Sequence, residues 1–112
     1  MSKAEFDLTL FEMQAEISKT LANPLRLAML HLLKDGEKTV NDLAQNLGIS
    51  QSNVSQHLAL MRQRQIVKTR KTGSTVYYRV ASPKISQACN MVREVLIEQL
   101  SQKQEIAKTF TA

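Results

Sequence analysis

Two short helical patterns that meet in a tight turn constrain the fold of this chain more than any other feature. Thr39 precedes Asp42 by three residues, which is typical of a capping box at a helix start. Gly48 closes the first pattern, and Ser50 is placed to cap the second. The apolar positions follow helical spacing: Val40, Leu43, Ala44, Leu47, then Val54, Leu58 and Met61. We therefore expect two short helices, the second with one polar face.

A segment rich in β-branched and aromatic residues follows these helices. Residues 66–70 and 75–80 have the composition of strands, and Gly73 between them can adopt the positive φ that a hairpin tip often needs. Two helices in a tight turn followed by a hairpin are the layout of a winged helix-turn-helix. The predicted fold class is mainly α-helical with a small β-hairpin wing.

Three further helical patterns flank this unit, and we expect helices over residues 5–19, 24–33 and 83–101. Asn23 and Ser82 each precede a proline, so each is placed to cap the helix that follows. The first and last helices carry more apolar surface than a small domain covers, along two stripes: Phe6, Leu10, Met13, Ile17, and Ile85, Cys89, Val92, Val95, Leu96, Leu100. These terminal helices are the predicted dimer seam, with residues 108–112 expected to fray.

The residues between Asp42 and Glu94 contain no acid. Residues 1–42 hold seven acids against five bases and residues 94–112 hold three against two, so the net charge of +5 arises in the middle. The bases there are Arg62, Arg64, Lys68, Arg70, Lys71, Arg79, Lys84 and Arg93. Such asymmetry predicts a nucleic acid partner. A membrane surface is disfavoured, because no basic amphipathic helix with an aromatic anchor occurs.

The 112 residues fit one domain spanning 1–112. The start of the chain has no signal-peptide apolar region, so we expect a cytoplasmic protein. Cys89 is the only cysteine, which excludes an intrachain disulfide and an intrachain multi-thiolate metal site. No glycine-rich phosphate loop or nucleophile-elbow spacing occurs, so an enzyme is not expected.

Three stretches of the chain resemble the ArsR-type (ArsR/SmtB) bacterial and archaeal transcription regulators. They are Ala22-Asn23-Pro24-Leu25-Arg26-Leu27, Ile49-Ser50-Gln51-Ser52-Asn53-Val54-Ser55-Gln56-His57-Leu58 and Thr75-Val76-Tyr77-Tyr78. The resemblance spans nearly the whole chain. It implies a homodimer with the order α-α-α-α-β-β-α, a recognition helix in the major groove, and repression relieved by an inducer or a thiol modification. We expect a transcriptional repressor that binds double-stranded DNA sequence-specifically and is released from a pseudo-palindromic operator by an unidentified signal.

The candidate DNA contacts fall in two groups. On the polar face of the second short helix, the glutamines suit base edges and the serines suit close approach to the backbone: Gln51, Ser52, Ser55 and Gln56. At the wing, cations and hydroxyls are expected to meet phosphates or the minor groove: Arg70, Lys71, Thr72, Ser74 and Thr75. His57, Arg62 and Lys68 are further candidates. The alternative for all of them is a solvated polar surface.

Several residues keep two interpretations. Arg26 is placed to touch a phosphate or to pair with an acid of the first helix. His57 is placed to reach phosphate or to hydrogen-bond locally. We expect Tyr77 and Tyr78 to pack against the protein rather than stack on bases, with one side chain pointing inward and the other partly exposed.

The known metal-sensing sites of the family have no match here, and of the two cysteines of its thiol-sensing members only one has a candidate counterpart, Cys89. Metal-sensing relatives carry Cys-x-Cys where this chain has Thr39-Val40-Asn41, and the last helix offers only Glu94 and Glu98. His31 has no second ligand at suitable spacing, so no metal or cofactor is expected. Cys89 favours packing over redox sensing, which would need a symmetry mate with Cα atoms within about 7 Å. Gln65 stands where relatives commonly have glycine, so that turn is expected to be less comfortable.

The main alternative function is a winged-helix protein-interaction module that does not bind DNA. A non-sensing or redox-responsive regulator is a further possibility. Salt-dependent, sequence-selective DNA binding separates these readings.

Overall fold

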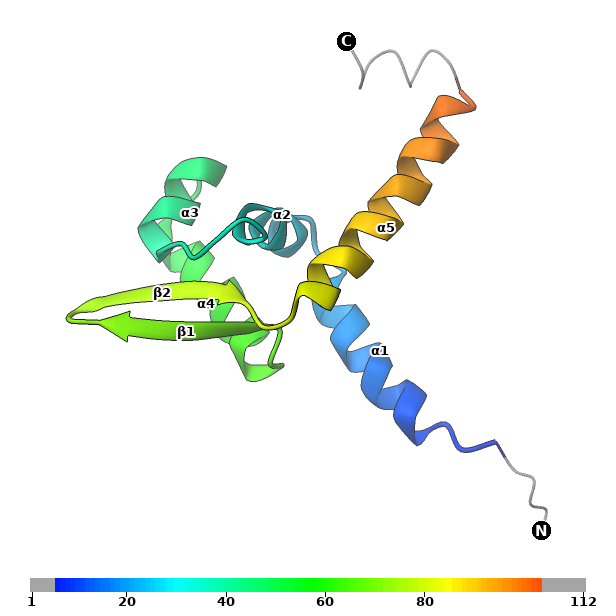
Figure 1. Ribbon diagram of the computed structural model, residues 1–112, viewed down its shortest axis with the longest axis horizontal. Helices are drawn as coiled ribbons and strands as arrows, with labels where there is room; N and C mark the ends of the chain where they lie inside the picture. Colours follow the sequence, from blue (N-terminus) through cyan, green and yellow to red (C-terminus); the bar gives the residue numbers. More distant parts are fainter. Residues whose placement is uncertain (1–5, 104–112) are drawn as a thin grey trace.

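The computed structural model describes residues 6–103 (Figure 1). Five helices and one antiparallel hairpin follow in the predicted order. They are α1 (Thr9–Leu21), α2 (Pro24–Leu33), α3 (Val40–Leu47), α4 (Gln51–Gln63), β1 (Val67–Thr72), β2 (Thr75–Val80) and α5 (Pro83–Ser101). The predicted winged helix-turn-helix fold is confirmed. Within the described residues, no helix is both long and apolar enough to span a bilayer.

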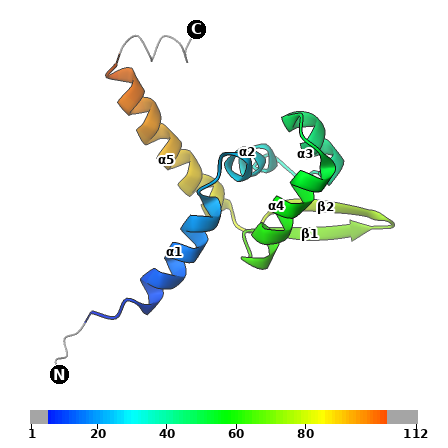
Figure 2. The ribbon, with the colours of Figure 1, turned by 180° about the vertical axis from the view of Figure 1, so that it is seen from behind.

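The hydrophobic core lies where α2, α3, α4 and the start of β1 meet. Seen from behind, α4 lies across the hairpin with α3 beside it (Figure 2). The buried side chains are Met29, Leu30, Leu33, Leu43, Ala44, Val54, Leu58, Met61, Ile66 and Val67. Most of the helical positions follow the predicted spacing, but Leu30 was not among the predicted positions, and the predicted Val40 and Leu47 are only half-buried. Because α4 places its whole apolar face in this core, its other face is held toward solvent.

The turn between α3 and α4 forms as the sequence predicts. Asp42 N–H donates to Thr39 Oγ1 at 3.1 Å, and Thr39 N–H donates to Asp42 Oδ2 at 3.0 Å, which completes the capping box. Gly48 ends α3 in the left-handed region with φ of 66°. Ser50 Oγ accepts the Asn53 N–H at 3.1 Å and caps α4. These contacts set the direction in which α4 leaves α3.

The hairpin is longer at its tip than predicted. β1 covers Val67–Thr72 where residues 66–70 were expected, because the ladder continues to the pair Thr72 and Thr75. Gly73 and Ser74 form a two-residue loop, and φ of 61° at Gly73 fits a type II′ turn. The other edge of β2 is covered by a backbone bridge between Tyr78 and Lys38.

The first helix starts later than predicted. It begins at Thr9, whose N–H donates to Asp7 Oδ1 at 2.9 Å, and not at residue 5, which lies outside the described residues. Phe6 therefore precedes the helix, and its ring stacks on Phe11 with centroids 5.3 Å apart. The prediction for the last helix is confirmed over residues 83–101, capped by Ser82 Oγ. The fraying expected of residues 108–112 also concerns positions outside the described residues.

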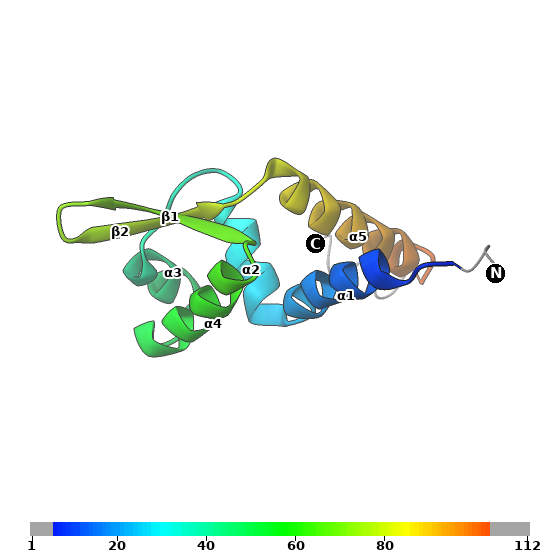
Figure 3. The same ribbon diagram turned by 90° about the horizontal axis from the view of Figure 1, so that it is seen from below.

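Helices α1 and α5 form two arms at the end of the molecule opposite the wing tip (Figures 1 and 3). Their apolar stripes remain exposed to solvent in the single chain, reaching 71% for Val92 and 69% for Leu10. The exposed set is Phe6, Leu8, Leu10, Phe11, Met13, Ile17, Met91, Val92, Val95, Leu96 and Ile97. An apolar surface of this kind marks an interaction site.

Candidate nucleic-acid interface

The outward face of α4 gathers the four residues predicted to read bases. Gln51, Ser52, Ser55 and Gln56 are all exposed, whereas Val54, on the opposite face, is fully buried. The face is polar and uncharged over its first two turns. Its amides and hydroxyls can both donate and accept hydrogen bonds, which matches the mixed donor and acceptor pattern of the major groove.

Gln51 is held in place by a residue of α3. Its Nε2 donates to Asn41 Oδ1 at 3.0 Å, across the turn between the two helices. The Gln51 carbonyl oxygen and one amide hydrogen then keep their capacity for another partner. The sequence did not predict a role for Asn41 in positioning Gln51. The one indication of this contact was the position of Asn41 in the first turn of α3, close to the first residue of α4.

The wing tip presents exposed polar residues beyond the body of the molecule (Figure 1). Lys71, Thr72 and Ser74 are exposed, and Thr75 is half-buried. No described acid lies within ion-pair distance of Lys71, so its charge faces solvent. This arrangement suits contact with a phosphate backbone.

Arg70 differs from the other wing residues because its guanidinium already forms an ion pair with an acid. Its Nε lies 3.1 and 3.0 Å from the two carboxylate oxygens of Glu37, and a second guanidinium nitrogen donates at 2.9 Å. The hydrogen bond from Arg70 lowers the pKa of Glu37. The guanidinium also stacks over the Tyr77 ring at 4.8 Å from its centroid. Glu37 precedes the acid-free stretch in sequence, so only the folded chain brings it to the wing.

The two tyrosines have packing roles, as predicted. Tyr78 packs against the hydrophobic core, and Tyr77 supports the Arg70 guanidinium on the other face of the hairpin. Both rings are half-buried, so the expected contrast between one inward and one exposed ring is smaller than predicted. The backbone bridge between Tyr78 and Lys38 covers the outer edge of β2 at this position.

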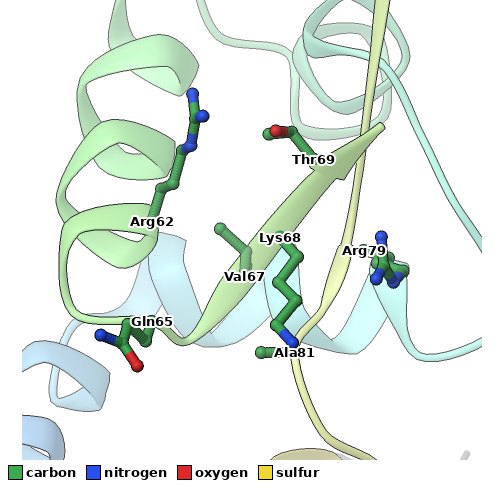
Figure 4. A pocket seen from close by; sticks show the side chains of 7 residues that line it. All are labelled: Arg62, Gln65, Val67, Lys68, Thr69, Arg79 and Ala81. Atoms are coloured by element: carbon green, nitrogen blue, oxygen red, sulfur yellow. The ribbon is translucent and has the colours of Figure 1, made fainter. Parts of the chain in front are cut away.

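A cationic groove of about 530 Å³ lies between the end of α4 and the base of the wing (Figure 4). Arg62 comes from α4, while Lys68 and Arg79 are cross-strand partners. The remaining lining is neutral: Gln65, Val67, Thr69 and Ala81. The groove therefore concentrates three positive charges with no acid among its lining residues. Arg79 was absent from the predicted contacts, although its place in the acid-free stretch was visible in the sequence.

Gln65 forms the turn that joins α4 to this groove. Its φ is 62°, in the left-handed region that glycine adopts most easily. Gln65 N–H donates to the Arg62 carbonyl at 3.0 Å and Ile66 N–H donates to the Met61 carbonyl at 2.8 Å, which is the Schellman pattern of a helix end. The expectation of a less comfortable turn at Gln65 matches this conformation.

Arg26 does not form the ion pair with an acid of the first helix that was one of its two predicted contacts. Its Nε donates to the Thr20 carbonyl, and its Nη1 lies 3.2 Å from His57 Nδ1. Burial, and then the Arg26 charge, lower the pKa of His57, so the neutral ring is favoured. The local hydrogen bond considered for His57 is therefore present. Arg64, at the end of α4, forms an ion pair with Glu16 at 3.3 Å.

Cys89 is half-buried and packs against the core. Burial raises the pKa of its thiol, which disfavours the reactive thiolate. His31 is exposed on α2. Within residues 6–103, no three side chains of the metal-binding types cluster as a metal site would require. The structure offers the reading face, the wing and the groove as its polar recognition surfaces.

Comparison with known proteins identifies relatives along most of the chain. This chain is 33% identical over 104 residues to the uncharacterized HTH-type transcriptional regulator Rv0081 of Mycobacterium tuberculosis. The match covers 92% of this chain and 91% of that protein. The crystal structure of Rv0081 matches with a TM-score of 0.76 and 34% identity, over 85% of this chain and 96% of that one. The biofilm growth-associated repressor of Xylella fastidiosa is 35% identical over 88 residues, which are 79% and 77% of the two chains.

A solution NMR structure of Mb0332 from Mycobacterium bovis is also similar. It is described as a homodimeric winged helix-turn-helix DNA-binding domain of a possible ArsR-family transcriptional regulator. It matches with a TM-score of 0.79 and 29% identity, over 90% of this chain and 95% of that one. Residues 23–69, from the cap of α2 to the middle of β1, match the family described as bacterial regulatory protein, arsR family. This chain belongs to the arsR family of bacterial regulatory proteins.

Proposed function

We propose that this protein is a homodimeric regulator that binds a pseudo-palindromic operator in double-stranded DNA. The observation that carries the proposal is α4, whose apolar face is fixed in the core while four neutral polar residues face solvent beside a cationic groove. A helix presented in this way fits the major groove, and its donors and acceptors match base edges. Membership of the arsR family supports a role in transcription and a location in the cytoplasm.

The dimer is proposed to form through α1 and α5. Their exposed apolar stripes lie at the end of the molecule opposite the wing tip (Figure 3), so pairing leaves both reading faces open. The Mb0332 relative is described as homodimeric. A two-fold dimer of helix-turn-helix units reads half-sites about 34–36 Å apart.

The proposed DNA contacts divide by chemistry. Gln51 and Gln56 read base edges, and Ser52 and Ser55 contact the backbone close to them. The groove of Arg62, Lys68 and Arg79 receives a backbone phosphate between the helix and the wing. Lys71, Thr72, Ser74 and Thr75 extend this contact at the wing tip. Arg70 has a smaller role in DNA binding than its position in sequence suggests, because Glu37 neutralises it.

Repression by occupying the promoter is the proposed outcome of binding. The Xylella fastidiosa relative is named a repressor. Cys89 is proposed to be a packing residue, since its thiol is half-buried with a raised pKa.

The test is DNA selection followed by fluorescence anisotropy over a range of salt concentrations. The full chain is used to select sequences from a random duplex library, and the affinity for the selected sequence is compared with that for a scrambled one. We expect an inverted repeat, at least about a thousandfold preference over scrambled DNA, and affinity that falls steeply with salt. Absence of any selected sequence, with weak binding to all DNA, would favour the protein-interaction module instead.

A further inference from the structure

The last turn of α1 has a carbonyl that the helix cannot satisfy. Because α1 ends at Leu21, the Thr20 carbonyl is one of the last four carbonyls of the helix, which have no N–H donor within it. Arg26 fills this place with its Nε. Thr20 is only 5% exposed, so its carbonyl is shielded from water that could substitute for this donor.

The same guanidinium reaches the recognition helix. Arg26 Nη1 lies 3.2 Å from His57 Nδ1, in the second turn of α4. Arginine only donates hydrogen bonds, so Nδ1 is the acceptor and the neutral ring carries its proton on Nε2. Burial and the Arg26 charge lower the His57 pKa, which favours this neutral form. Arg26 therefore connects the end of α1 to the side of α4.

The shape of the guanidinium makes this connection directional. A guanidinium is planar and presents its N–H groups in a fixed fork, so two of its hydrogen bonds define a direction between their acceptors. Among the described residues, α1 and the end of α4 also make a direct polar contact through the Glu16–Arg64 pair, whose side chains are 52% and 42% exposed. Exposed pairs of this kind hold an orientation weakly. Arg26 is the better placed of the two contacts to set the angle.

We propose that Arg26 is a positioning residue that holds the recognition helix α4 at a fixed angle to the dimerisation helix α1, and so sets the half-site spacing that the dimer accepts. This inference rests on the proposed function, because it needs a dimer through the terminal helices and an operator with two half-sites. α1 belongs to the dimer side of each protomer and α4 to the DNA side. A change in the angle between them moves both recognition helices relative to the two-fold axis.

The experiment measures spacing preference separately from affinity. Wild type, Arg26→Met and His57→Leu are compared on duplexes whose two half-sites are moved apart or together by one and two base pairs. Each base pair shifts the half-sites by about 3.4 Å. Lys34→Met is the matched control, since it removes one positive charge from an exposed position at the other end of α2. Circular dichroism and size-exclusion chromatography establish that each variant is a folded dimer.

We expect wild type and Lys34→Met to prefer one spacing by about tenfold over its neighbours. Arg26→Met and His57→Leu are expected to reduce that preference to within about threefold, with affinity for a single half-site changed less than about twofold. A merely structural role would lower affinity equally at every spacing. If Arg26→Met does not fold, His57→Leu alone decides the result, because His57 is half-buried and is not one of the buried core residues.

An unchanged spacing preference in the folded variants would overturn the proposal. A uniform loss of affinity for His57→Leu would also overturn it, by showing that His57 acts through a direct DNA contact. Failure of the proposed function is distinguishable, because wild type itself would then select no two-half-site operator.

Discussion

The carboxylate of Glu37 accepts three hydrogen-bonding contacts from the Arg70 guanidinium, which joins the loop before α3 to the middle of the wing. Tyr77 lies under the same guanidinium. The pair places one acid on a surface that is otherwise basic in this region. Its effect is to orient the wing while removing one positive charge from the phosphate-facing surface.

Glu37→Gln is expected to strengthen DNA binding. The substitution leaves Arg70 charged without a carboxylate partner, so the slope of log affinity against log salt should become steeper by about one phosphate equivalent. Anisotropy titrations at four salt concentrations measure this slope. Asp35→Asn, an exposed position in the same loop, makes the same change in net charge. Equal slopes for the two variants would show that the Glu37–Arg70 pair does not limit DNA binding.

The double variant Gln51→Ala and Gln56→Ala is expected to lose sequence preference while keeping salt-dependent binding. Each good side-chain contact to a base is worth about 1–3 kcal/mol of discrimination, so the selected and scrambled duplexes should bind with nearly equal affinity. Competition anisotropy with the two duplexes measures the ratio. Gln87→Ala with Gln99→Ala, both exposed on α5, is the matched control. Retained selectivity in the first double variant would refute the assignment of the reading face.

Substitutions at Gln65 test the left-handed turn after α4. Gln65→Val is expected to lower the free energy of unfolding by about 1–2 kcal/mol, since β-branched residues tolerate positive φ poorly. Gln65→Gly should be at least as stable as wild type, because the αL conformation carries no Cβ penalty in glycine. Urea denaturation gives both values. Gln63→Val, at the last residue of α4, should cost less than about 1 kcal/mol, and an equal cost at both positions would contradict a strained Gln65.

Stability should depend on pH through His57. Its pKa in the folded protein is lowered from the ordinary value of 6.5, so below that pH the unfolded chain binds the proton more readily. The contribution of neutral His57 to the free energy of unfolding is fully present above pH 6.5 and is lost as the pH falls toward the pKa of His57 in the folded protein. Chemical denaturation between pH 5 and pH 8, at about half-unit steps, measures the trend.

The matched comparison for this trend is His57→Gln, which cannot titrate. Its free energy of unfolding should fall less than that of wild type as the pH is lowered through the same range. A fall of equal size would assign the pH dependence to other groups. The lowered pKa values of Asp7 and Asp42 act at lower pH, because their ordinary value is 3.8.

Local chemistry in the sequence determined most of the fold. The capping box of Thr39, the glycine at position 48 and the prolines at positions 24 and 83 act within a few residues, so their effects are visible without a structure. The polar face of α4 followed from the same helical spacing that selected its buried face. Boundaries were less accurate where pairing decided them, as when the ladder carried β1 to Thr72.

Contacts between distant segments needed the tertiary structure. Glu37 reaches Arg70 across 33 positions and Arg26 reaches His57 across 31, and no periodicity links residues so far apart. The sequence showed that Arg70, Arg26 and His57 were polar residues suited to DNA. The folded chain decided that one is neutralised by an acid and that the other two hold each other, because a side chain's partner depends on which helices and strands the core brings together.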